Sequence, residues 1–310
     1  MISDKIGHVS NGLYVCGLTW SPVLLLDCTC PVLFEAGFAC AARLYEKDIK
    51  GVLGERRPGT LFLTHVHWDH CGATGYLKQV FPDLKVAASA RSAAIIARPS
   101  AQSRITELGK TVIPIVAAVE GVDNSVLVDE PFEPFDVDIV LHDGQVIQVD
   151  KDISVEVLTT PGHTRDHLSY YIPERKILIG GEAAGCLEPG GSIDVEFLAD
   201  YEAYLASLRR LLTVPAETFS QGHNYLFVGR ESVKAFLEQS IKAAEDFAAH
   251  VHGLLRAEGG SIERVVSRIK AEQHDPKPGL KQPDKAYLLN LTAQVTHLYQ
   301  TREGIGKSEK

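Results

Sequence analysis

Short apolar runs separated by turn residues fill the first 90 positions of the chain. Runs of three or four apolar residues bounded by Gly, Pro or Asn are typical of buried strands. The strands expected from this pattern are 13–15, 23–26, 32–34, 61–63 and 86–88. Helical spacing follows two of them, over 38–47 and 76–81. This alternation of strands and helices indicates an α/β architecture.

The pattern weakens between Arg91 and Pro134, where four prolines interrupt it. We therefore expect an insertion that lies over the core. Further strands are expected at 146–149, 155–158, 168–172 and 176–179. The last two flank Pro173-Glu174-Arg175, which suits a hairpin turn.

Apolar residues at helical spacing dominate the last third of the chain. Helices are expected over 203–212, 233–254, 262–269 and, capped by Asp284, 284–298. The second of these stops at Gly259-Gly260, and Pro276 follows the third. We divide the chain into a first domain, residues 1–228 with an insertion at about 91–134, and a helical region, residues 229–310. The apolar stripe on the appended helices makes a homodimer plausible.

Composition narrows the classes of function. The 310 residues include 31 Lys and Arg against 40 Asp and Glu, a formal charge of −9, which argues against a nucleic-acid partner. No apolar run is long enough to span a membrane, so no membrane association is expected. The first residues lack the pattern of a secretory signal, and six cysteines are too sparse for a disulfide scaffold. A cytoplasmic protein is the expectation.

Three histidines and one aspartate occur within six residues, directly after the expected strand 61–63: His65, His67, Asp69 and His70. Imidazole nitrogen and carboxylate oxygen are ligands that zinc and iron accept, as does manganese. If residues 65–67 are extended, both imidazoles point the same way, and a helix start can bring Asp69 and His70 to a second position. One segment can thus serve two metal ions. The alternative, four ordinary polar residues in a core, is disfavoured because burying them unpaired is costly.

This stretch resembles the HxHxDH motif of the metallo-β-lactamase superfamily. Its members share a four-layer αββα sandwich with a mono- or dinuclear metal site at its edge, so the resemblance implies that fold here, with appended C-terminal helices and a catalytic domain over 1–228. Thr160-Pro161-Gly162-His163-Thr164 resembles the family's GHT turn, and Gln221-Gly222-His223 resembles its last GH element. The family usually has Gly-Asp where this chain has Gly181-Glu182.

The resemblance implies two divalent ions per chain, zinc or iron, with manganese possible. His65, His67 and His163 would hold the first ion. Asp69, His70 and His223 would hold the second. Glu182 is one methylene longer than aspartate and can bridge both ions, bind one, or leave the site mononuclear; bridging is our interpretation. His167 would support the ligands from behind, and Tyr225 could reach a substrate oxygen.

These ligands point to a metal-dependent hydrolase, in which a metal-bound hydroxide attacks the carbonyl of a small-molecule thioester, ester or lactone. Asp69 would also orient the nucleophile and pass its proton to the leaving group. The appended helices resemble the thioesterase-like branch that contains the quinolone-signal response protein of pseudomonads. Two alternatives stay open: a mononuclear iron dioxygenase of the persulfide type, and a regulator that keeps the hydrolase site but acts through its C-terminal helices.

Overall fold

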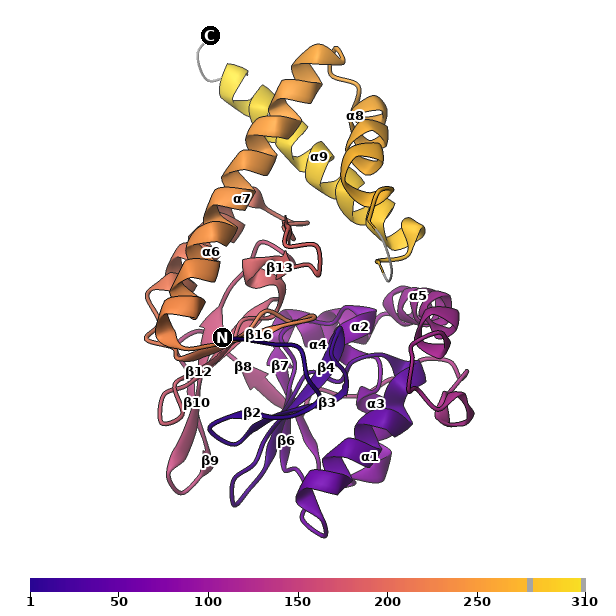
Figure 1. Cartoon of the computed structure of the whole chain (residues 1–310), viewed down its shortest axis with the longest axis vertical. Coiled ribbons are helices and arrows are strands. Elements are labelled where there is room, and N and C mark those ends of the chain that lie inside the picture. Colours follow the sequence, from indigo (N-terminus) through magenta and orange to yellow (C-terminus); the bar gives the residue numbers. More distant parts are fainter. Residues whose placement is uncertain (278–280, 308–310) are drawn as a thin grey trace.

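Two seven-stranded sheets face each other in the structure, a computed structural model that describes residues 1–277 and 281–307, with side chains through residue 301 (Figure 1). The first sheet contains, in spatial order, β2 (Gly7–Ser10), β3 (Leu13–Leu18), β4 (Ser21–Leu26), β5 (Val32–Phe34), β6 (Thr60–Phe62), β7 (Lys85–Ser89) and β8 (Ile139–Leu141). The second contains β1 (Ile2–Ser3), β16 (Leu226–Val228), β15 (Thr218–Ser220), β12 (Ile177–Ile179), β11 (Leu168–Ile172), β10 (Ile153–Thr159) and β9 (Val146–Asp150). A separate hairpin pairs β13 (Cys186–Leu187) with β14 (Ile193–Asp194).

The central strands are continuously apolar because both of their faces are buried. In β4, Leu24 and Leu26 point into the core between the sheets, whereas Val23 and Leu25 pack on the outer helices. Side chains of β10, β11 and β12, such as Tyr170, fill the same inter-sheet core from the opposite sheet. Successive side chains of a strand point to opposite faces of the sheet. One run of apolar residues therefore contributes both to the core between the sheets and to the core under the outer helices.

Helices cover the outer face of each sheet. The first sheet is covered by α1 (Ala42–Leu53), α3 (Thr74–Val80), α4 (Ala90–Ile96) and α5 (Pro99–Ala117). The second is covered by α6 (Tyr201–Leu212) and α7 (Arg230–Ala257). The four layers form an αββα sandwich, so the fold implied by the family resemblance is confirmed.

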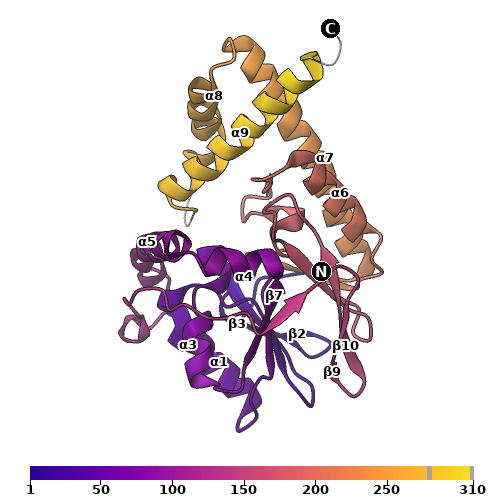
Figure 2. The same cartoon turned by 180° about the vertical axis from the view of Figure 1, so that it is seen from behind.

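The C-terminal helices extend beyond the sandwich (Figures 1 and 2). The first half of α7 packs on the second sheet, where Phe236 contacts Phe219 and Phe227, so the division at residue 228 stays a prediction. Its distal half packs against α8 (Ile262–Ile269) and α9 (Asp284–Lys307). An ion pair between Lys285 and Glu107 connects α9 to α5. Among the helices of the described residues, none combines the length and apolar character needed to cross a membrane.

The apolar stripe of the appended helices is covered within the chain. Val251 and Leu255 of α7, Val265 of α8 and Val295 of α9 belong to one buried cluster that continues into the second sheet. The stripe therefore gives no argument for a second subunit, and a homodimer stays a prediction.

The segment expected to be an insertion over the core, interrupted by prolines, contains two helices, α4 and α5. Pro99 occupies the first turn of α5, where a missing backbone N–H removes no intrahelical hydrogen bond, and Pro114 is accommodated inside the helix. Ile105, Val112 and Val116 are buried in the same core as α1. Reading every proline as a break was wrong, because a proline in a first turn favours a helix.

Most other elements occur close to where the pattern predicts them. The helix expected at 38–47 is displaced, since a 3₁₀ helix (Ala39–Ala41) precedes α1. Further 3₁₀ helices span Asn124–Val126 and Gly181–Ala184, and a π-helical turn spans Lys270–His274. The short strands β1, β2 and β15 were not predicted. Equally short strands such as β5 and β6 were predicted, because a continuous apolar run marks them.

The loop between β10 and β11 approaches α6 too closely for any side chain at Gly162. Gly162 has φ +136°, and a Cβ atom there would lie 2.3 Å from Cα of Tyr204. Its carbonyl accepts hydrogen bonds from the main chain of Ala199 and Asp200, just before α6 begins. The loop and the start of α6 are therefore held as one unit.

We expect Gly162→Ala to lower the free energy of unfolding by about 2 kcal/mol or more, because the methyl group meets the backbone of Tyr204. Urea denaturation of the metal-free protein measures this. The matched control is Gly109→Ala in α5, where a Cβ meets no atom within 4 Å. Gly109→Ala should raise the free energy of unfolding by roughly 0.5–1 kcal/mol. Equal effects of the two substitutions would contradict the packing argument.

Candidate metal centre

The ends of strands from both sheets bring the polar side chains to one edge of the sandwich. His65 and His67 follow β6, and the short helix α2 (Trp68–Cys71) then carries the rest of the histidine motif. His163 lies in the loop after β10, Glu182 in the 3₁₀ helix after β12, and His223 in the loop after β15. Because β12 and β15 are parallel, the residues that follow them emerge at the same edge.

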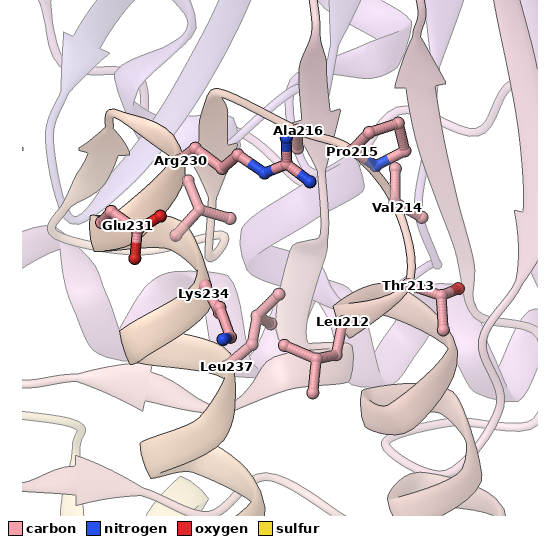
Figure 3. A pocket seen from close by; sticks show the side chains of 10 residues that line it. Leu212, Thr213, Val214, Pro215, Ala216, Arg230, Glu231, Lys234 and Leu237 are labelled. Carbon is pink, nitrogen blue, oxygen red and sulfur yellow. The ribbon is translucent and has the colours of Figure 1, made fainter.

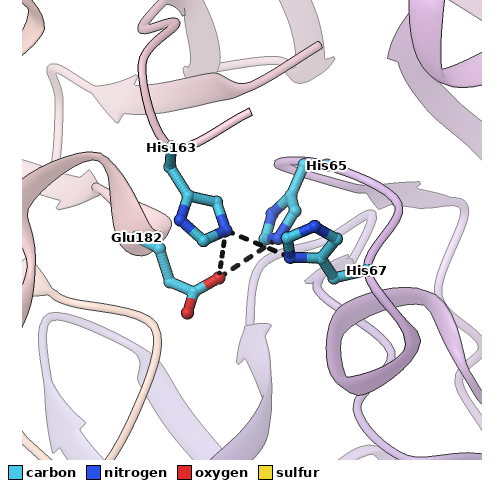
Figure 4. Close-up of side chains that lie close together, drawn as sticks. All are labelled: His65, His67, His163 and Glu182. Carbon is cyan, nitrogen blue, oxygen red and sulfur yellow. Dashed lines mark hydrogen bonds and ion pairs between the residues drawn. The ribbon is translucent and has the colours of Figure 1, made fainter. Parts of the chain in front are cut away.

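Four side chains converge at the first position: His65, His67, His163 and Glu182 (Figure 4). Glu182 Oε2 lies 2.8 Å from His163 Nε2 and 3.1 Å from His65 Nε2. His163 Nε2 lies 3.1 Å from His67 Nδ1. The candidate ligand atoms of this group are all within 4.8 Å of one another.

A second group contains Asp69, His70 and His223. The Nε2 atoms of His70 and His223 are 3.2 Å apart, and Asp69 Oδ2 lies 3.8 Å from His223 Nε2. Glu182 contacts this group as well, with Oε2 3.2 Å from His70 Nε2 and Oε1 3.2 Å from His223 Nε2. The structure thus brings together all seven residues named from the sequence, with Glu182 between the two groups.

The donor set suits divalent cations. Among the residues that the structure describes, Asp69 Oδ1 is buried without a hydrogen-bond partner. His65 Nε2 and Glu182 Oε2 are close, yet their angular geometry makes no hydrogen bond, and both atoms are otherwise unsatisfied. Unsatisfied buried polar atoms are costly, and a cation would satisfy several at once. Imidazole and carboxylate ligands in this number fit zinc, iron or manganese.

Electrostatics favour a charged Glu182 carboxylate, with neutral imidazoles at His65 and His67. Burial alone would raise the pKa of Glu182, but the neighbouring His163 and hydrogen bonds from imidazoles outweigh it, and the pKa lies well below its usual range. Burial and the nearby histidines lower the pKa of His65, and burial together with His163 lowers that of His67 to about 4. Neutral imidazoles at these two positions keep a lone pair available for a metal ion.

The other three histidines shift in the opposite direction. Burial alone would lower the pKa of His70, His163 and His223, but neighbouring carboxylates outweigh it. Glu35 raises the pKa of His70, and Glu182 raises that of His163 and of His223.

A surrounding layer of contacts orients the rings. In each of four histidines, Nδ1 faces away from the centre and contacts a neighbouring oxygen. His65 contacts Thr64 Oγ1, and His70 contacts Glu35 Oε1. His163 contacts the carbonyl of Glu196, and His223 contacts the carbonyl of Trp20. Such contacts fix the tautomer and direction of ligand rings. His167 stacks on His65 with ring centroids 5.1 Å apart, and its Nδ1 lies 2.9 Å from Thr160 Oγ1. This place is compatible with the supporting role expected of His167.

Glu35 is the buried residue of this layer that sequence reasoning missed. It follows β5, has φ +65° and is 2 % exposed. Its carboxylate accepts hydrogen bonds from the backbone and hydroxyl of Thr64 and lies 3.3 Å from His70 Nδ1. Glu35, His65 and His70 also form a third group with metal-ligand geometry. The sequence offered one sign of this residue, an acidic side chain directly after the continuously apolar strand 32–34.

Two hollows lie near the C-terminal helices. One, of about 440 Å³ between the end of α6 and the start of α7, is lined by none of the candidate ligands (Figure 3). The other, of about 580 Å³, lies between the β14 segment and α7 and α9. It is lined in part by Glu196, whose carbonyl contacts His163, so it borders the layer behind the first group.

Curated relatives match the chain over about half of their own length. The hydroxyacylglutathione hydrolase of Bartonella tribocorum is 28% identical over 177 residues, which cover 54% of this chain and 49% of that protein. The atrochrysone carboxyl ACP thioesterase of Aspergillus fumigatus is 25% identical over 185 residues, covering 60% of this chain and 43% of that protein. The finer resemblance to the quinolone-signal branch stays a prediction.

Solved structures share the fold at low sequence identity. A metallo-beta-lactamase family protein of Thermus thermophilus has a TM-score of 0.62 at 19% identity, with 94% of each chain covered. A metallo-beta-lactamase superfamily protein of Sulfolobus tokodaii has a TM-score of 0.58 at 16% identity, covering 94% of this chain and 100% of that one. The family model described as the metallo-beta-lactamase superfamily matches residues 21–223, well over half of the chain. With the sandwich and the convergent histidines, this match shows that the chain belongs to the metallo-β-lactamase superfamily.

Proposed function

We propose that this protein is a hydrolase that uses two divalent metal ions, zinc or iron, to cleave a thioester. The observation that carries the proposal is the position of Glu182, whose carboxylate lies within 3.2 Å of imidazoles from both groups. A divalent ion supplies two effects in such a site: it acidifies a bound water and it polarises a carbonyl.

The residues of the chain would bind the two ions and transfer the proton. His65, His67 and His163 would hold the first ion, and Asp69, His70 and His223 would hold the second. Glu182 would serve both positions. Asp69 Oδ1 has no hydrogen-bond partner in the described residues, which leaves it able to accept a proton from the attacking water. The same carboxylate can return that proton to the departing sulfur. Water thus adds oxygen to the acyl carbon, and its proton leaves with the thiol.

A thioester is preferred over an ester or lactone because of the relatives. Their names, hydroxyacylglutathione hydrolase and ACP thioesterase, describe acyl groups carried on a thiol. The substrate is accordingly proposed to be a small acyl-thioester. A persulfide dioxygenase or a regulator with a retained site would share the same ligand residues. Metal analysis distinguishes the dioxygenase, which would hold a single iron, from the dinuclear hydrolase.

We expect about two equivalents of metal per chain in protein purified without added metal, and about one in Glu182→Ala, because the carboxylate between the groups is removed. Elemental analysis measures this, with Glu182→Asp as the variant that keeps a carboxylate. The exposed Glu217→Ala is the control and should keep the parent content. A single iron unchanged by either substitution would mean that Glu182 is no ligand and would favour the dioxygenase.

Replacing Glu35 by Gln should weaken metal binding by about 10- to 100-fold, because the acceptor that orients His70 loses its charge while its shape is kept. Calorimetric titration of the metal-free protein gives the affinity. Glu46→Gln, which alters a surface contact with Lys50 and Tyr76, is the matched control. Parent-like affinity in Glu35→Gln would show that His70 does not depend on this contact.

Asp69→Asn should lower kcat on acyl-thioesters by at least about 100-fold, because the amide cannot accept the proton of the attacking water. A panel of thioesters, esters and lactones, assayed at saturating metal, measures this loss and the substrate preference together. Asp83→Asn, on the exposed turn before β7, should leave rates unchanged. Full activity in Asp69→Asn would remove Asp69 from the proton transfer.

A further inference from the structure

Gln221 lies two residues before His223, and its carboxamide contacts the segment that follows Glu182. It directly follows β15 and its side chain is fully buried. Its Oε1 accepts a hydrogen bond from the Leu187 amide at 2.8 Å, and its Nε2 donates to the Leu187 carbonyl at 3.0 Å. The carboxamide thus pairs with both the backbone N–H and the backbone C=O of Leu187. Leu187 pairs with Ile193 of β14 in a two-stranded hairpin. Gln221 therefore satisfies the backbone N–H and C=O of Leu187 in the way that a neighbouring strand would.

The same Nε2 contacts the loop that carries His223. It lies 2.7 Å from the carbonyl of His223 and 3.2 Å from Cys186 Sγ. The two hydrogens of the amide are therefore shared among three acceptors. The His223 carbonyl also accepts a hydrogen bond from the Tyr225 amide at 2.6 Å. Gln221, Tyr225 and, at 3.9 Å, the Cys186 thiol thus donate to the main chain of His223. The Trp20 carbonyl holds its ring at Nδ1.

The loop needs this attachment because its own conformation is irregular. Gly222 has φ +96° and Asn224 has φ +56°, so left-handed residues flank His223 on both sides. Gly222 also lies against the Glu182 segment, since a Cβ atom on it would be 3.3 Å from the carbonyl carbon of Gly181. No regular strand hydrogen bonds fix the loop at residues 221–225.

We propose that Gln221 is a positioning residue that fixes His223 relative to Glu182 and thereby sets the geometry of the second metal position. Its carboxamide joins the strand that follows Glu182 to the carbonyl of His223, so the two segments cannot shift independently. The proposal rests on the proposed function in one respect, that His223 and Glu182 bind metal. Gln221 itself touches neither metal nor substrate.

The test is a zinc titration of the metal-free protein, followed by calorimetry. Gln221→Met keeps the length of the side chain but removes its hydrogen bonds. We expect the more weakly bound second ion to lose about 10- to 100-fold in affinity, while the first ion binds as in the parent. The matched control is Gln148→Met, which removes a carboxamide that donates to the carbonyls of Lys151 and Ile153 in the β9–β10 turn. That control should bind both ions as the parent does.

A cycle with His223→Ala separates positioning from general stabilisation. In the His223→Ala background, Gln221→Met should have no further effect on the remaining ion, because the group that it positions is gone. A merely structural role would weaken the remaining ion or both ions. If Gln221→Met folds poorly, as judged by circular dichroism, Gln221→Glu replaces it. That variant keeps the acceptor for Leu187 and loses the donor to His223, and it should show the same selective loss.

The outcomes distinguish this proposal from the proposed function. If the parent binds two ions and Gln221→Met binds both equally tightly, the role of Gln221 is wrong and the dinuclear hydrolase stands. Equal weakening of both ions also overturns it. If the parent binds one ion, the two-metal part of the proposed function is wrong. Gln221 is then judged on that single ion, and an unchanged affinity overturns its role too.

Discussion

The carboxylate of Glu182, buried among imidazoles, is the interaction on which the rest of the structure depends. Its Oε2 atom lies 2.8–3.2 Å from nitrogens of His65, His70 and His163. A buried carboxylate is costly unless donors or cations surround it, so these histidines must reach it together. They come from loops after strands of both sheets. The segments at this edge of the sandwich must therefore place these imidazoles within hydrogen-bonding distance of one carboxylate.

That alignment is maintained by main-chain and side-chain contacts one layer further out. Carbonyls of Trp20 and Glu196, the Thr64 hydroxyl and the Glu35 carboxylate each hold the outer nitrogen of one imidazole. Each contact removes rotational freedom from a ring before any ion binds. Burial and the neighbouring His163 lower the pKa of His67, whereas the surrounding imidazoles lower the pKa of Glu182 against the effect of burial. The centre is thus preorganised, which reduces the entropy lost when a metal ion binds.

Sheet packing requires only apolar residues of suitable size, whereas the edge requires particular polar partners. Solved structures below 20% identity align over most of the chain, because a strand with two buried faces needs only apolar residues of suitable size. The C-terminal helices follow the same rule, since α7, α8 and α9 bury their stripe against one another and against the second sheet. Hydrogen-bonded residues at the edge, such as Gln221 and Glu35, have no such freedom because each must meet a particular partner.

The sequence by itself determined the layers, the family and the candidate ligands. Continuous apolar runs mark strands with two buried faces, and in His65-Val66-His67 the ligand spacing is local, so both are visible without a third dimension. It did not reveal the roles of Glu35 and Gln221, whose partners Thr64 and Leu187 lie 29 and 34 residues away. It also misjudged residues 91–134, where Pro99 starts a helix, and missed strands as short as two residues. Tertiary structure alone decided these features, because a short strand or a buried polar contact is stabilised by distant neighbours and has no local period.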